Sequence, residues 1–184
     1  MDQTPQQRVK MLFSGSIGFY VTAYSLYQTT GEIHFPAFVV NLAYAAELSV
    51  KSFVLNNLQN ADEKTLLEIG HNLNGGLQRA IDVGYAPPNK TTNELFEILN
   101  DHHSRHHARY LDGPPINMKP FGLMLTAMAH HLTTIGEQMS MPVQLPTPPS
   151  CESSSSLQTH CSRPTDSGNH HHGYSKQSPP APCG

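Results

Sequence analysis

Apolar residues recur every three or four positions along much of the first 140 residues, and this periodicity constrains the fold more than any other feature. The clearest segment spans 36–55, where these residues share one helical spacing: Val39, Leu42, Ala46, Val50 and Phe53. Such spacing places them on one face of an α-helix. The alternation of apolar and polar residues that marks a strand is missing from the sequence. The periodicity therefore predicts an all-α chain.

Glycine and proline divide this pattern into segments. We expect helices over 16–29, 36–55, 62–69, 73–81, 91–110 and 120–139. Gly70 and Gly84 are expected to end two of them, and a capping box from Thr91 to Glu94 is expected to begin another. Because the links are short, the segments predict a compact bundle of five or six helices.

The composition changes after Met141. Eight of the fifteen prolines and all three cysteines lie beyond this residue, whereas Ile, Phe and Met are missing there. A segment of this kind buries too little apolar surface to offset the cost of ordering its backbone. We therefore expect a folded domain over 1–141 and a disordered tail, rich in Pro, Ser and His, over 142–184.

Charge and cysteine content narrow the class of protein. The formal net charge is −3 at pH 7, so the sequence has no basic field that would drive non-specific binding to nucleic acid. The predicted folded domain contains no cysteine, and the tail has no CxxC pair that would indicate a zinc site. The uncharged stretch 11–30 contains too many Ser, Thr and Tyr residues to span a membrane. We expect a reduced, cytoplasmic protein without a cofactor or a membrane partner.

The stretch Asp101–Tyr110 contains the densest group of residues able to do chemistry, with four histidines and two arginines. At 100° per residue, the side chains that continue the apolar stripe of this predicted helix are His102, His106 and Arg109. His103 and His107 lie on its flank. Three interpretations remain open: a metal site made of i,i+4 histidine pairs, a proton-transfer or phosphate-binding site, and polar packing at a helix end or dimer interface. Polar packing is favoured, and no metal ligands are assigned because no motif supplies a third and fourth ligand.

Histidines and an arginine on a buried stripe need polar partners, because burying such groups alone is costly. Glu47, on the predicted helix 36–55, is one candidate partner. It also stands four residues before Lys51, so a salt bridge within that helix is the simpler expectation for it. His130 and His131 are expected to be packing or surface residues in the last helix.

Three segments resemble the HEPN superfamily of helical nucleotide- and RNA-associated domains. Asn41–Phe53 resembles the family's apolar-Ala-x-Glu-Leu-x-x-Lys helix, and Gly70-His71-Asn72-Leu73 resembles its Gly-His-Asp/Asn-Leu element. The helix ending in Arg109-Tyr110 resembles the family's closing segment. The resemblance covers roughly residues 15–115, and it implies a compact helical bundle that forms a homodimer.

Many members of this family are metal-independent ribonucleases that carry an arginine followed, after four to six residues, by a histidine. Here Arg105 and Arg109 have no histidine at that spacing, and the one pair that fits, Arg163 and His170, lies in the predicted tail. The resemblance therefore implies a non-catalytic module in a bacterial defence or stress system. Its partner would be RNA or a nucleotide, or an antitoxin or other protein.

The residues assigned to binding in this module are Arg105, His103, Glu47 and His71. Two alternatives stay open. One is a metal-independent endoribonuclease with a rearranged site, in which His102, His106 and Arg109 are catalytic and Glu47 or Asp101 orients a histidine. The other is a purely structural dimerisation domain.

Overall fold

The computed structural model describes residues 4–29, 35–58, 63–103, 120–141 and 143–147, all within one compact unit. These residues contain helices and no strand, so the predicted all-α bundle is confirmed. The helices are α1 (Pro5–Gln28), α2 (Phe35–Asn57), α3 (Glu63–Ile69), α4 (Leu73–Asp82), α5 (Lys90–His103) and α7 (Phe121–Gln138). The predicted helical stretch 104–110, and the predicted tail from 148 onward, lie outside the described residues.

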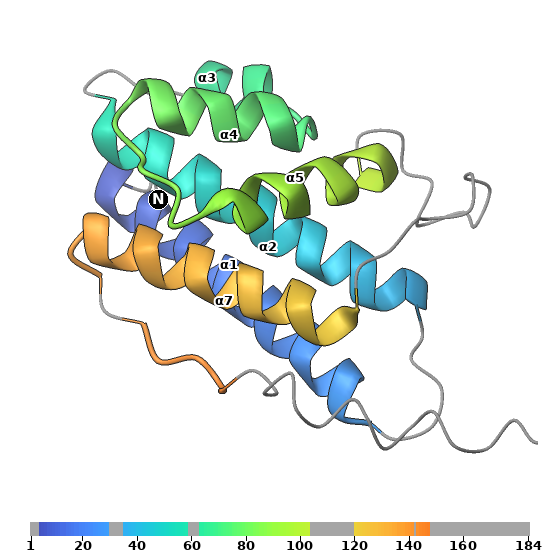
Figure 1. Cartoon of the computed structure of the whole chain (residues 1–184). Coiled ribbons are helices and arrows are strands. Elements are labelled where there is room, and N and C mark those ends of the chain that lie inside the picture. The colour runs from blue at the N-terminus through green and yellow to red at the C-terminus, as the bar shows by residue number, and fades with distance from the viewer. Residues whose placement is uncertain (1–3, 30–34, 59–62, 104–119, 142, 148–184) are drawn as a thin grey trace, which may run out of the picture. The chain divides into compact units, whose positions relative to one another are not determined.

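Helix α2 is the central element of the bundle. It packs against α1 and α7 and also against α4 and α5, so it runs between these two pairs of helices (Figure 1). By length and composition, Pro36–Asn57 is apolar enough to cross a membrane, with a mean hydropathy of 1.4. However, 72% of that window is buried inside the bundle, which is also the property of a core helix. Its neighbours therefore account for its apolar character.

Helix α1 begins at Pro5, well before the residue 16 that the apolar pattern predicts. The reason is a capping box. The Thr4 hydroxyl accepts a hydrogen bond from the Gln7 backbone N–H at 3.2 Å, and the Thr4 N–H donates to Gln7 Oε1 at 2.9 Å. Pro5 then occupies the first helical position, where its missing N–H costs nothing. The helix ends at Gln28, close to the predicted end.

The capping box predicted from Thr91 to Glu94 is wrong. Helix α5 begins at Lys90, and the Asn89 side chain accepts the hydrogen bond from the Thr92 N–H at 3.1 Å. Asparagine is at least as good an N-cap as threonine, and Asn89 is the earlier of the two in the chain. Thr91 therefore lies inside the first turn of the helix.

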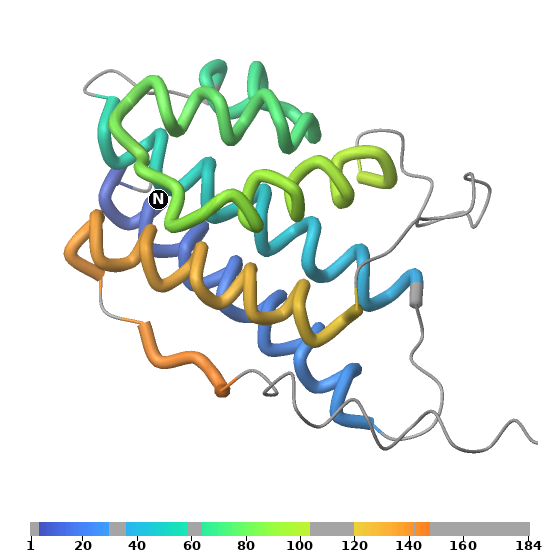
Figure 2. The backbone as a smooth tube through the Cα atoms, viewed as in Figure 1, coloured from blue at the N-terminus to red at the C-terminus, as the bar shows by residue number. Residues whose placement is uncertain are grey.

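The residues after α7 fold back along the helix that they follow (Figure 2). The Met141 N–H donates to the Gly136 carbonyl at 2.7 Å, and the side chains of Val143 and Leu145 pack against the core. Gly136 makes this close approach possible, because a Cβ atom there would lie 2.5 Å from Val143 Cγ2 and 2.6 Å from the Met141 carbonyl oxygen.

Candidate functional site

The buried carboxylate of Glu47 is the centre of the candidate site. Only 6% of its side chain is exposed, and both of its oxygens accept hydrogen bonds. Lys51 Nζ donates to Oε1 at 2.6 Å, one helical turn further along α2. Oε2 contacts two histidine rings, His103 Nε2 at 2.5 Å and His71 Nδ1 at 2.9 Å. The carboxylate therefore joins three segments that are far apart in the sequence.

His71 lies in the corner between α3 and α4, and local hydrogen bonds fix this corner. Gly70 has φ +55°, a left-handed conformation that ends α3 as the sequence predicts. Asn72 then caps α4, since its side chain accepts from the Gly75 N–H at 2.9 Å. The Leu73 N–H donates to Asn100 Oδ1 on α5, also at 2.9 Å, which attaches the corner to that helix. His71 is thus held between the start of α4 and the end of α5.

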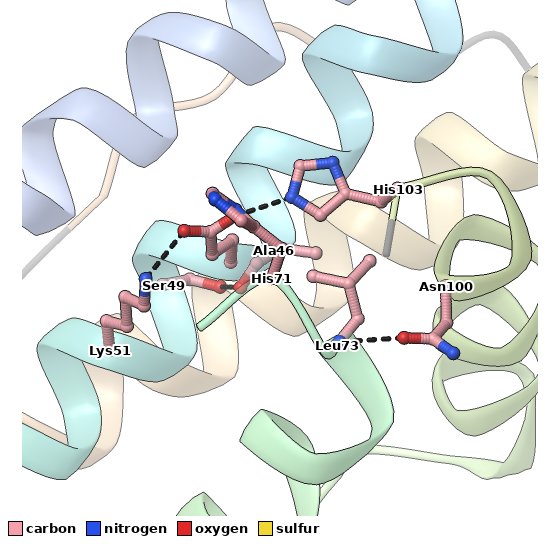
Figure 3. A network of polar contacts seen from close by, with 8 residues as sticks. Ala46, Ser49, Lys51, His71, Leu73, Asn100 and His103 are labelled. Carbon is pink, nitrogen blue, oxygen red and sulfur yellow. Dashed lines mark hydrogen bonds and ion pairs between the residues drawn. The ribbon is translucent and has the colours of Figure 1, made fainter. Parts of the chain in front are cut away.

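His103 is the last described residue of α5, and its side chain is only 3% exposed. Its ring packs edge-on against Tyr44 of α2 and against His71, with centroid distances of 5.0 and 5.5 Å. Figure 3 shows Lys51 and His103 at opposite ends of the cluster, with His71 between them. The His71 side chain is 46% exposed, so the cluster reaches solvent through this residue.

The electrostatic balance of the cluster favours an ionised Glu47. Burial alone would raise the pKa of its carboxyl group, but the hydrogen bonds from His103, Lys51 and His71, together with the charge of Lys51, lower that pKa to about 2. The carboxylate is therefore negative at any physiological pH. A negative oxygen beside an imidazole fixes which ring nitrogen carries the hydrogen.

This arrangement allows three kinds of chemistry. A half-exposed imidazole held by a buried carboxylate can accept and donate a proton. When protonated, it can donate a charge-assisted hydrogen bond to a phosphate. Two imidazole nitrogens and a carboxylate oxygen on one side of a cluster can also hold a metal ion.

A second buried histidine, His131 of α7, belongs to the core. Its Nε2 lies 2.8 Å from Ser49 Oγ on α2, and its Nδ1 lies 2.6 Å from the Tyr85 hydroxyl. The Ser49 hydroxyl donates to the Ala46 carbonyl, so its oxygen accepts from His131 Nε2, and Nδ1 accepts from Tyr85. Burial lowers the pKa of His131 to about 3 and raises that of Tyr85. His131 is therefore a neutral packing residue, as expected, and His130 beside it is exposed.

The structure brings together three of the four residues assigned to binding, namely Glu47, His71 and His103. The expected salt bridge of Glu47 with Lys51 is also present. His102 is buried in the last turn of α5. The fourth binding residue, Arg105, and the two other residues of the catalytic alternative, His106 and Arg109, lie outside the described residues.

The sequence pattern did not indicate the hydrogen bonds between Ser49, Tyr85 and His131. Tyr85 follows the positive-φ Gly84 that ends the α4 segment, and a single tyrosine after a turn carries no signal of its own. The apolar residues on either side of His131 were its only sign of burial.

Comparison of the chain with family models, curated proteins and solved structures finds no match.

Proposed function

We propose that this chain is an HEPN-like module that binds the phosphate-bearing part of a nucleotide or RNA at the Glu47–His71–His103 cluster and does not cleave it. One observation carries the proposal. The segments that resemble the family are distant in the sequence, yet Glu47 of the first contacts His71 of the second and His103 of the third. If the three short matches were unrelated to one another, their residues would not be expected to contact one another in the fold.

Charge supports an anionic ligand. One carboxylate faces a lysine and two imidazoles, so the cluster becomes net positive once a histidine is protonated. His71 is the member with the most exposed side chain, and it offers a charge-assisted hydrogen bond to a phosphate oxygen. In the sequence, Arg105 follows His103 by two residues, and arginine is the side chain best suited to phosphate. The spacing that marks the family's ribonucleases occurs only in the predicted tail, so the proposal is binding rather than cleavage.

Fluorescence anisotropy of a labelled single-stranded RNA, with unlabelled nucleotides as competitors and EDTA present, tests the proposal. The wild-type chain should bind, and His71→Ala should weaken binding about 10-fold, the worth of one charge-assisted hydrogen bond. His130→Ala is the matched control, because it removes an exposed histidine from α7. Absence of binding, or equal affinity in the His71→Ala variant, would overturn the proposal.

A metal-independent ribonuclease is the second candidate, and the Glu47–His71 contact favours it. A carboxylate that orients an imidazole at the surface is an arrangement used in general acid–base catalysis. Incubation of total RNA with the protein in EDTA distinguishes the two functions. Cleavage that His71→Ala abolishes, and that a double His102→Ala/His106→Ala variant also reduces, would favour the enzyme. Intact RNA with measurable binding favours the module.

The proposal includes a homodimer in the cytoplasm, with an antitoxin or another protein as an additional partner. Sedimentation of the full chain at micromolar concentration should give twice the mass of one chain. A monomer would leave the purely structural dimerisation domain without support.

A further inference from the structure

Three atoms of the cluster are potential ligands for a metal ion. Glu47, His71 and His103 each offer one ligand atom within 4.8 Å of the other two, and Glu47 Oε2 contacts both His71 Nδ1 and His103 Nε2. They come from the middle of α2, the corner before α4 and the end of α5. The hydrogen bond from the Leu73 N–H to Asn100 Oδ1 attaches the corner to α5. The three donors are thus positioned by the fold rather than by neighbouring residues in the sequence.

We propose that Glu47, His71 and His103 bind one divalent transition-metal ion of the zinc type. Two imidazole nitrogens and one carboxylate oxygen are the ligands of one class of three-ligand zinc site. With metal–ligand bonds near 2.1 Å, neighbouring donors stand about 3 to 3.5 Å apart. Glu47 Oε2 lies 2.9 Å from His71 Nδ1 and 2.5 Å from His103 Nε2, so small side-chain rotations would make room for the ion.

The exposed fractions of the three side chains suit a metal site. The Glu47 and His103 side chains are 6% and 3% exposed, so water competes little for their ligand atoms. The His71 side chain is 46% exposed, which gives an ion a route of entry and leaves the solvent side of the site for a water molecule. Binding requires each facing ring nitrogen to give up its hydrogen, which moves to the other ring nitrogen or to solvent.

The positive charge of Lys51 opposes binding of the ion, which leads to a specific expectation for metal affinity. Its ammonium group contacts Glu47 Oε1 at 2.6 Å, so it leaves Oε2 to the metal, but its positive charge repels a cation a few ångströms away. Removing that charge should strengthen metal binding. A cluster that only ties the three segments together by hydrogen bonds makes no such prediction.

Titration of the metal-free full chain with Zn²⁺ in a calorimeter tests the proposal. Seven substitutions in the C-terminal segment first remove its histidines and cysteines: His160→Ala, His170→Ala, His171→Ala, His172→Ala, Cys151→Ser, Cys161→Ser and Cys183→Ser. In this background, one Zn²⁺ should bind per chain, and Co²⁺ should give visible d–d absorption without the bands of a thiolate ligand. No nucleic acid is present, so the result is independent of the proposed phosphate binding.

The variants decide which residues hold the ion. His71→Ala should weaken Zn²⁺ binding at least about 100-fold, more than the loss of an outer partner usually costs. This residue is half exposed, so the chain should stay folded, which circular dichroism checks. Lys51→Met should bind Zn²⁺ at least about 10-fold more tightly, and His130→Ala should bind it as the parent does. No binding, or binding that survives His71→Ala and is lost in His106→Ala or His107→Ala, overturns the proposal.

Discussion

The Glu47 carboxylate is contacted by the side chains of Lys51, His71 and His103, so its loss should be costly. In a Glu47→Gln variant, the ammonium group of Lys51 loses its carboxylate partner, and the Lys51 side chain is only 13% exposed. Removing one partner of a buried ion pair typically destabilises a protein by about 3 kcal/mol or more. Urea denaturation monitored by circular dichroism should therefore show a loss of about 3 kcal/mol in the free energy of unfolding.

The chain supplies a matched control for this variant. Glu68 and Lys64 are also an i,i+4 pair, but their side chains are 63% and 82% exposed and 3.9 Å apart. Glu68→Gln should change the free energy of unfolding by less than about 0.5 kcal/mol. Equal losses of free energy of unfolding in the two variants would mean that burial of the Glu47 carboxylate does not make its ion pair more important for stability.

His131 makes stability depend on pH in a defined window. Burial lowers its pKa from 6.5 to about 3, so between these values the unfolded chain binds a proton that the folded chain does not. Stability is therefore complete above the unfolded pKa and falls as pH falls below 6.5. At pH 5 the loss from this residue should be about 2 kcal/mol. The pKa of Glu47 is lowered from 4.5 to about 2, so its contribution is lost only at lower pH.

Denaturation by urea between about pH 7.5 and pH 5 measures this effect. A double Tyr85→Phe/His131→Leu variant removes the imidazole and the hydroxyl that faces it, while Ser49 keeps its bond to the Ala46 carbonyl. Its stability should fall by about 2 kcal/mol less than that of the wild type over this range. An unchanged pH dependence would contradict the role of His131.

At the scale of the helix, the sequence predicted which elements exist better than where they begin. The core helix α2 and the ends of α3 and α4 follow from apolar spacing and from Gly70 and Gly84. The predicted start of α1 was too late, although Val9 and Phe13 extend its apolar face toward the N-terminus and Thr4 and Gln7 form a capping box that can be read from the sequence. Hydrogen bonds at helix ends therefore carry positional information that periodicity does not.

Part of the site could also be predicted from the sequence. Glu47 and His71 were singled out by short motifs, and α5 was expected to supply histidines to Glu47. The prediction assumed one apolar stripe on α5 and therefore placed His103 beside the buried face. In the structure, however, His103 contacts Glu47. Helix α5 packs against α2, α4 and α7, so its buried surface is wider than one stripe and includes Phe96, seven residues before His103. One sequence cannot show how many neighbours a helix will have.

Two glycines in helices test the packing of these elements. Gly136 of α7 lies against Phe13, Met141 and Val143, and an added Cβ would meet atoms as near as 2.5 Å. Gly136→Ala should therefore destabilise the protein by about 1 to 3 kcal/mol, although alanine is the better helix former. Gly18→Ala in α1 meets nothing within 4 Å and should instead stabilise it by up to about 1 kcal/mol. Thermal unfolding of both variants measures the difference, and stabilisation by Gly136→Ala would show that the segment after α7 does not pack as described.

At the scale of the whole molecule, the net charge of −3 limits how the proposed module can bind nucleic acid. A chain with a broad basic surface releases many counterions and loses affinity steeply as salt rises. Here the positive groups of the described site are confined to one cluster around a carboxylate. Affinity for RNA must therefore come from a few local contacts, and the remaining charge of the molecule opposes it weakly.

This restriction predicts a shallow salt dependence. Two phosphate contacts to single-stranded RNA give a slope of about −1.4 for log K against log salt, so affinity should fall only about 7-fold between 50 and 200 mM salt. Fluorescence anisotropy at four salt concentrations in that range measures the slope, and His71→Ala should make it shallower by about 0.7, the share of one phosphate. A protein making eight such contacts would lose about 2,000-fold over the same range. A slope that steep, or one that His71→Ala leaves unchanged, would place RNA binding outside the Glu47–His71–His103 cluster.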